Sequence, residues 1–467
     1  MDVFYVAVFG ALAVLAATLE LSKSWDTSTA PLTREFTRFR ANYVAVYGLM
    51  MAGDWLQGPY VYALYQHYGF DRGDIGRLFI AGFGSSMVFG TVVGSLADKS
   101  GRKKAALTYV ATYMFGCATK HWNNFYVLLV GRVFCGVATS LLYSAFESWL
   151  VAEHFKRGFD GAWLGGVFSK AVLIGNGLVA ILAGLLAHLL VETFAVGPVA
   201  PFDAASLVLF IGGLVVLTTW TENYGDTSDK TGSVLETFRS AAQAIASDQK
   251  IALLGAMQSL FEGSMYTFVF LWTPALSPKG EHLPHGMIFA CFMVASMAGS
   301  ALAGRLLATS SRVRPEKYMQ TVFAISAVSL FVPVIFHRTT ADEYDSLSPD
   351  APGITWEGKL QLMAFCVFEF LVGIFWPSMM KMRSQYVPEG MRSTIINFFR
   401  IPLNAFVCIV LYNVSAFPLA AMFGMCTLFL TIAAACQRRL ETIAGRDKDY
   451  ALVDAGDSTD VDLKSQA

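Results

Sequence analysis

The chain has 467 residues, of which 55% are hydrophobic and only 15% are charged, whereas soluble domains carry about 25% charged residues. The mean hydropathy of +0.50 excludes an ordinary soluble protein and indicates a polytopic membrane protein. The formal net charge is −1 and no basic run interleaves with aromatic residues, so nucleic-acid binding is not expected.

The predicted membrane spans follow from the apolar stretches, because a helix needs about 20 mainly apolar residues to cross a bilayer. We expect an all-α fold. The thirteen candidate spans lie near 2–21, 43–66, 76–97, 105–121, 124–152, 162–190, 201–220, 251–276, 286–308, 317–337, 359–386, 394–413 and 417–436.

The first span could be a cleaved signal peptide or a permanent helix. A signal peptide carries positive charge before its apolar core. Here Asp2 precedes the core, and Lys23 and Arg34 follow it. We therefore expect residues 1–22 to form an uncleaved extra helix.

The other twelve spans divide into two sets of six around a polar linker. Within them LQGPYVY at 56–62 resembles FEGSMYT at 261–267, as two parallel six-helix repeats would. The predicted organisation is an extra helix at 1–22, a cytoplasmic linker at 23–42, six-helix bundles at 43–220 and 251–436, a cytoplasmic linker at 221–250, and a disordered cytoplasmic tail at 437–467.

The orientation follows from the placement of Lys and Arg, which favour cytoplasmic segments. With the 98–104 loop in the cytoplasm, cytoplasmic segments hold 25 of the 34 Lys and Arg residues and exterior segments hold 6. We therefore expect a cell-membrane protein with its N-terminus outside and its C-terminus in the cytoplasm.

The seven cysteines all fall inside apolar stretches. This placement is typical of small core residues rather than of a disulfide or metal framework. No CxxC or HExxH spacing is present. We expect no metal, no cofactor and no enzyme activity.

Residues 94–107 read GSLADKSGRKKAAL, between the second and third core spans. A glycine at 94 allows two helices to approach closely, an aspartate at 98 can pair with a cation or cap a neighbouring helix, and a glycine at 101 permits a tight turn. The alternative is a chance match in a positively charged loop. The loop is similar to the major facilitator signature G-x-x-x-D-(R/K)-x-G-R-(R/K), which implies a role in conformational change for Gly94, Asp98, Lys99, Gly101, Arg102 and Lys103.

The charged residues inside the spans are the main candidates for a site, because each costs about 3 kcal/mol or more in the bilayer and must pair or face water. Lys170 and Arg400 occupy matching places in the two halves, and Asn397 and Asn404 share a helical stripe with Arg400. The cations are Arg132, Lys170 and Arg400, and the anions are Asp54, Glu147, Glu262 and Glu369.

Paired cations at a central cavity suit a small dianion, since Arg offers a planar fork of donors and Lys a point charge. We expect Lys170, Arg400, Asn397, Asn404 and Arg132 to bind it. The alternative is that the charges close into salt bridges between helices. Arg132 could pair with a carboxylate, and Glu147 could be solvated near the cytoplasm.

The same charges predict proton coupling. The spans hold three cations and four anions before a dianion enters. Uncompensated buried charge costs several kcal/mol per ion, so protons would have to enter with the anion. We expect Asp54 and Glu262 to carry them, with Glu369 and Glu147 as further candidates.

Five blocks of sequence carry a further resemblance. They are AGDWLQGPYVYALYQHYGF at 52–70, SAFESW at 144–149, LFEGSMYTFVFLWTP at 260–274, FWPSM at 375–379 and NFFRIPL at 397–403. These blocks resemble the eukaryotic molybdate-anion transporters of the major facilitator superfamily. The resemblance covers residues 1–436 and implies a twelve-helix core with an extra N-terminal helix, and uptake of molybdate by alternating access. Two alternatives stay open, a carrier of an organic solute such as a sugar and a non-transporting nutrient receptor.

Overall fold

The computed structural model describes residues 3–22, 33–70, 72–225, 234–276, 285–308, 313–336, 354–412 and 417–465. Within these ranges every regular element is a helix, which confirms the predicted all-α class. Parts of the two predicted linkers, 23–32 and 226–233, lie outside the described residues.

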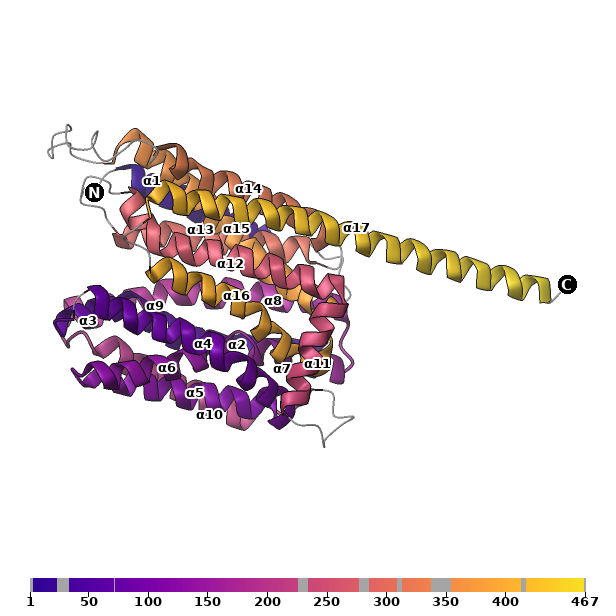
Figure 1. Ribbon diagram of the computed structural model, residues 1–467, viewed down its shortest axis with the longest axis horizontal. Helices are drawn as coiled ribbons and strands as arrows, with labels where there is room; N and C mark the ends of the chain where they lie inside the picture. Colours follow the sequence, from indigo (N-terminus) through magenta and orange to yellow (C-terminus); the bar gives the residue numbers. More distant parts are fainter. Residues whose placement is uncertain are drawn as a thin grey trace.

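The first half of the bundle packs lengthwise beside the second, and each predicted span coincides with helical residues (Figure 1). The first half contains α2 (Arg34–Gln57), α3 (Val61–His67), α4 (Arg72–Ser100), α5 (Arg102–Ala118), α6 (Phe125–Leu142), α7 (Ala145–Lys156), α8 (Leu164–Val172), α9 (Val179–His188) and α10 (Ala200–Thr219). The second half contains α12 (Gln249–Leu276), α13 (His285–Leu306), α14 (Pro315–Phe336), α15 (Trp356–Tyr386), α16 (Arg392–Tyr412) and α17 (Leu419–Ser465).

The helices differ in how apolar they are. In the described part of the chain, nine are long and apolar enough to cross a membrane, or ten if the two parts of α4, bent by 48°, are one span. Among the others, α5 has 17 residues, and α2 and α12 carry Asp54 and Glu262 within their apolar runs. Two of the more polar helices, α2 and α12, therefore carry candidate site residues.

The two halves meet mainly where α4 packs along α16 and where α8 packs against α13 and α15. A Cβ atom on Gly94 of α4 would lie 2.9 Å from the carbonyl oxygen of Ser393, so a larger residue would push α16 away. This confirms the close helix approach expected at Gly94. We call the end of the bundle that carries residues 94–103 the motif end.

The extra helix α1 (Val3–Leu21) packs on the second half, chiefly against α13. Arg305 of α13 donates to the carbonyl oxygen of Leu19 at 2.8 Å and also bonds the carbonyl oxygen of Thr18. A cation at these positions satisfies carbonyls that the end of a helix leaves free. Arg305 therefore anchors the C-terminal end of α1.

Helix α11 (Val234–Ser247) lies within the predicted central linker and was not expected. It runs across the motif end and contacts α4 of the first half and α16 of the second (Figure 1). Ala241 is fully buried, and the ring of Phe238 lies 4.7 Å from that of Phe398. Its apolar face explains why this polar segment folds against the bundle.

The expected disordered tail at 437–467 differs from the structure, in which α17 continues to Ser465. Gln437 donates to the backbone oxygen of Glu316 at 2.9 Å, and Leu440 and Ala444 are buried. These contacts hold the first turns beyond the span, from which the helix projects away from the bundle (Figure 1). The sequence analysis treated residues 437–467 as a charged tail and so did not expect Leu440 and Ala444 to be buried against the bundle.

Candidate functional site

A cavity of about 250 Å³ lies between the two halves. Helices α2, α4, α5 and α6 of the first half form most of its wall, and the second half contributes Tyr266 and Arg400. Its polar lining includes Asp54, Gln57, Ser86, Tyr113, Arg132, Thr139, Tyr143, Tyr266 and Arg400.

The cavity brings together two of the three predicted intramembrane cations, one from each half. The Nε atom of Arg132 donates to the carbonyl oxygen of Leu78 at 3.3 Å, and its guanidinium lies over the ring of Phe79 at 4.9 Å. No carboxylate of the described residues is within ion-pair distance of Arg132. The described residues therefore do not provide the carboxylate partner that the sequence analysis considered for Arg132.

Arg400 is buried beside Glu262, and their contact is loose. Its Nη1 atom lies 3.9 Å from Oε2 of Glu262, beyond hydrogen-bond distance. Within the described ranges, neither carboxylate oxygen of Glu262 has a hydrogen-bond partner, nor do Nε and Nη1 of Arg400. Unfilled buried donors are costly, so Arg400 retains the capacity to bind an anion.

The other two predicted carboxylates of the centre lie at different places. Asp54 lines the cavity and accepts a hydrogen bond from the hydroxyl of Tyr113. Glu369 is 6% exposed on α15 and does not line the cavity.

Asn397 and Asn404 of α16 bond the first half instead of lining the cavity. The amide of Asn397 donates to the hydroxyl of Ser144 at 3.0 Å, and the amide of Asn404 donates to that of Ser86 at 3.3 Å. Both residues are buried, and within the part of the chain described their amide oxygens accept no hydrogen bond. The structure places them as contacts between the halves.

Glu147 is neither solvated nor in the cavity wall; it forms a buried ion pair across the halves. Nε of Arg383 donates to one carboxylate oxygen at 3.0 Å and Nη2 bonds the other, so the pair is bidentate. Nη1 of Arg383 donates to Gln258 at 2.6 Å. The sequence analysis missed Arg383 because it counted this residue with a cytoplasmic segment. The apolar residues one and two turns before it on the same face, Trp376, Met379 and Met380, would have indicated an inward face.

Lys170 does not join Arg400 at the cavity. Its side chain is exposed on α8. The preceding residue, Ser169, faces the other half and donates to the backbone oxygen of Ser300 at 2.7 Å. Since successive residues of a helix are turned by about 100°, Lys170 points away from that interface. The expected pairing of Lys170 with Arg400 is wrong because equivalent sequence positions need not share a helical face.

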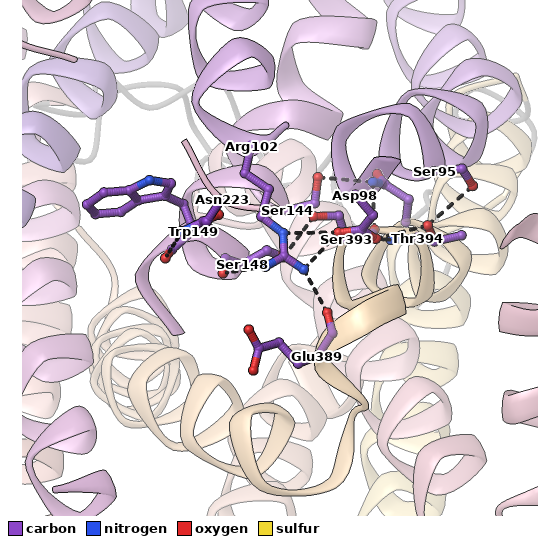
Figure 2. A network of polar contacts seen from close by, with 11 residues as sticks. Ser95, Asp98, Arg102, Ser144, Ser148, Trp149, Asn223, Glu389, Ser393 and Thr394 are labelled. Atoms are coloured by element: carbon purple, nitrogen blue, oxygen red, sulfur yellow. Dashed lines mark hydrogen bonds and ion pairs between the residues drawn. The ribbon is translucent and has the colours of Figure 1, made fainter. Parts of the chain in front are cut away.

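The 94–103 motif forms a buried network at the motif end, and Figure 2 shows its main contacts. Asp98 pairs with Arg102 at 3.0 Å and accepts hydrogen bonds from the backbone nitrogen of Thr394 at 3.0 Å and its hydroxyl at 3.1 Å. Arg102 also donates to the backbone oxygen of Glu389 at 2.7 Å. Asp98 therefore both pairs with a cation and caps α16, as expected.

The rest of the motif binds the start of the central linker. Gly101 has φ of 115°, which favours glycine, and confirms the expected tight turn. The carboxylate of Glu222 accepts from the backbone nitrogens of Lys103 and Lys104 and so caps α5. The Lys103 ammonium donates to the backbone oxygen of Trp220 at 2.7 Å, and Lys99 is exposed.

Comparisons with known proteins identify families and relatives that this chain resembles. A family model described as sugar transporters with 12 transmembrane helices matches residues 4–365. The molybdate-anion transporter of Xenopus tropicalis is 32% identical over 96% of both chains, and that of Takifugu rubripes is 31% identical over 96% of this chain and 98% of the relative.

Two solved structures share the fold at low sequence identity. The fucose:proton symporter of E. coli matches with a TM-score of 0.64 and 14% identity, over 87% of this chain and 99% of the symporter. The human organic anion transporter matches with a TM-score of 0.63 and 13% identity, over 87% of this chain and 100% of the other. The chain is therefore a multi-pass membrane transporter rather than an enzyme, and it belongs to the molybdate-anion transporter family of the major facilitator superfamily.

Proposed function

We propose that this transporter imports molybdate or a closely related tetrahedral oxyanion, and binds it between Arg132 and Arg400. The observation that carries the proposal is that these two guanidinium groups, one from each half, line one cavity. The names of the relatives at 31–32% identity support the same substrate.

The chemistry of the cavity suits a dianion. Each guanidinium presents a planar fork that matches two oxygens of a tetrahedral anion. The hydroxyls of Tyr143 and Tyr266 add neutral polar groups to the lining of the same cavity. Water takes up about 30 Å³ in the liquid, so a cavity of about 250 Å³ has room for an oxyanion and several waters.

We further propose that the motif end faces the cytoplasm of the cell, with the N-terminus outside and the C-terminus inside. The excess of Lys and Arg at that end supports this orientation. The contacts of Asp98, Arg102 and Glu147 with the second half then close the cytoplasmic side. Rocking of residues 43–220 against 251–436 would open it. Impermeant antibody on intact cells should label an N-terminal tag and not a C-terminal one.

Protons are the proposed coupling ion. Asp54 lines the cavity, and Glu262 lies 3.9 Å from Arg400. An arriving dianion adds negative charge beside both carboxylates, which favours their protonation. Release of the anion and the protons on the cytoplasmic side would then restore the empty site.

The experiment is uptake of radiolabelled molybdate by cells that express the protein, with unlabelled tungstate, sulfate or a hexose as competitors. We expect saturable uptake that tungstate suppresses and the hexose does not. Suppression by the hexose alone would indicate a sugar carrier. Binding of molybdate to the purified protein without uptake would indicate a receptor.

A further inference from the structure

Tyr143 separates the central cavity from a second, smaller one. The second cavity is about 10 Å³ and is lined by Tyr47, Leu142, Tyr143, Glu147, Trp376, Met380 and Arg383. Along α6 and α7, Tyr143 is the residue of the central cavity that lies nearest to the motif end. Tyr143 therefore lies at the boundary between the central cavity and the smaller one.

Two contacts from the second half hold the ring of Tyr143. The guanidinium carbon of Arg400 lies 4.7 Å from the ring centroid. The ring of Trp376 stacks with it at 5.7 Å and an angle of 19°. One contact is a cation–π interaction and depends on the positive charge of Arg400; the other is a stacked aromatic pair.

The backbone at Tyr143 is a break in the span. Helix α6 ends at Leu142 and α7 begins at Ala145. Tyr143 has φ of −87° and ψ of −1°, and Ser144 has φ of −124° and ψ of −54°. A side chain on such a break can turn without bending a continuous helix.

We propose that Tyr143 is the gate between the central cavity and the motif end, and that an oxyanion bound at Arg400 releases it. This inference rests on the proposed function and identifies how that site responds to its substrate. An anion on Arg400 neutralises the charge that attracts the ring. Only the stack with Trp376 then holds Tyr143 in place, and the path toward Glu147 and Arg383 opens.

The test uses a reporter on the far side of the gate. Met380, which lines the smaller cavity on the motif-end side of Tyr143, is changed to Cys. A membrane-impermeant thiol reagent is applied to intact cells from the opposite side, so that it must pass Tyr143 to reach the new cysteine. The protein without M380C measures labelling of the native cysteines. We expect slow labelling of M380C that molybdate accelerates by about fivefold or more.

Removal of the aromatic ring should open the gate without a substrate. M380C carrying Tyr143→Leu should label at the fast rate even without molybdate, and Tyr143→Phe, which keeps the ring, should restore slow labelling. If Tyr143→Leu fails to fold, Trp376→Leu tests the same gate from the other half. Labelling of the folded Leu variant as slow as that of M380C alone would overturn the proposal.

The two inferences can fail separately. Molybdate that binds the purified protein but leaves M380C labelling unchanged would overturn release by the anion. Absence of molybdate binding would overturn the proposed function and the release step, whereas the labelling of Tyr143→Leu without any anion would still decide whether Tyr143 is the gate.

Discussion

The motif end and the central cavity both bury arginines, but they differ in how those arginines are satisfied. At the motif end, Arg102 and Arg383 bond carboxylates of Asp98 and Glu147 at 3.0 Å. In the cavity, the one carboxylate of the described residues within ion-pair distance of Arg400 is 3.9 Å away.

This difference separates a structural role from a binding role. A buried charge that is fully paired holds helices in one arrangement, and removal of its partner leaves a costly uncompensated ion. A buried arginine with unfilled donors is instead available to a ligand. The exposure of a charge therefore says less about its function than the distance to its nearest counter-charge.

The largest effect should come from the cavity. Arg400→Gln removes a charged donor, which costs about 2 kcal/mol or more and corresponds to an affinity loss of about 30-fold or more. Direct binding of molybdate to the purified protein measures this. The matched control is Arg77→Gln, since Arg77 is 72% exposed and pairs only with Asp74 next to it on α4. Wild-type affinity in the Arg400 variant would show that the site lies elsewhere.

The largest effect on stability, as distinct from molybdate affinity, should come from the paired arginine at the motif end. Arg383→Gln leaves Glu147 buried without its cation, which should destabilise the protein by about 3–5 kcal/mol. Thermal unfolding in detergent measures it, with Asp74→Asn in an exposed pair as the control, expected at about 0–1 kcal/mol. The double variant E147Q/R383Q should lose less than the two single variants together. If Arg383→Gln and Asp74→Asn both lowered stability by the same small amount, the buried pair would contribute no more than the exposed one, and the structural role assigned to Arg383 would be wrong.

A smaller effect is expected for the motif. Asp98→Asn weakens the cap on Thr394, which joins the halves, and the pair with Arg102, whose guanidinium in turn bonds Glu389 of the second half. Hydrogen bonds to a charged group contribute about 1.5–3 kcal/mol, so we expect uptake to fall by about tenfold while molybdate affinity changes less than about twofold. Rates of uptake and binding constants are measured on the same preparation. A large loss of affinity would instead assign Asp98 to the binding site.

The smallest effect concerns the coupling ion. If protons enter with the anion, a lower external pH supplies more of them, so uptake should rise several-fold from mildly alkaline to mildly acidic medium. Asp54→Asn cannot exchange a proton and should flatten this dependence, with Asp74→Asn at the exposed end of α4 as the control. A flat profile in the wild type would exclude proton coupling.

The sequence predicted the helices well because their signal is local. An apolar stretch of about 20 residues predicts a span wherever it lies in the chain. The turn at Gly101 was predicted for the same reason, because it depends on the residues beside it. The cap by Asp98 joins residues 296 positions apart, and the sequence predicted only that Asp98 could cap a neighbouring helix. The prediction of helices failed for α11, which is apolar on one face only, so a search for continuously apolar stretches does not find it.

The partners of the buried charges were decided only by the tertiary structure. Arg383 meets Glu147 and Arg400 meets the ring of Tyr143 across the two halves, and no spacing along the chain encodes either contact. Lys170 and Arg400 correspond in sequence, yet a rotation of about 100° per residue directs one side chain away from the cavity and the other into it. Hydrophobicity determines which segments enter the membrane, whereas the packing of one helix face against another determines which charges meet.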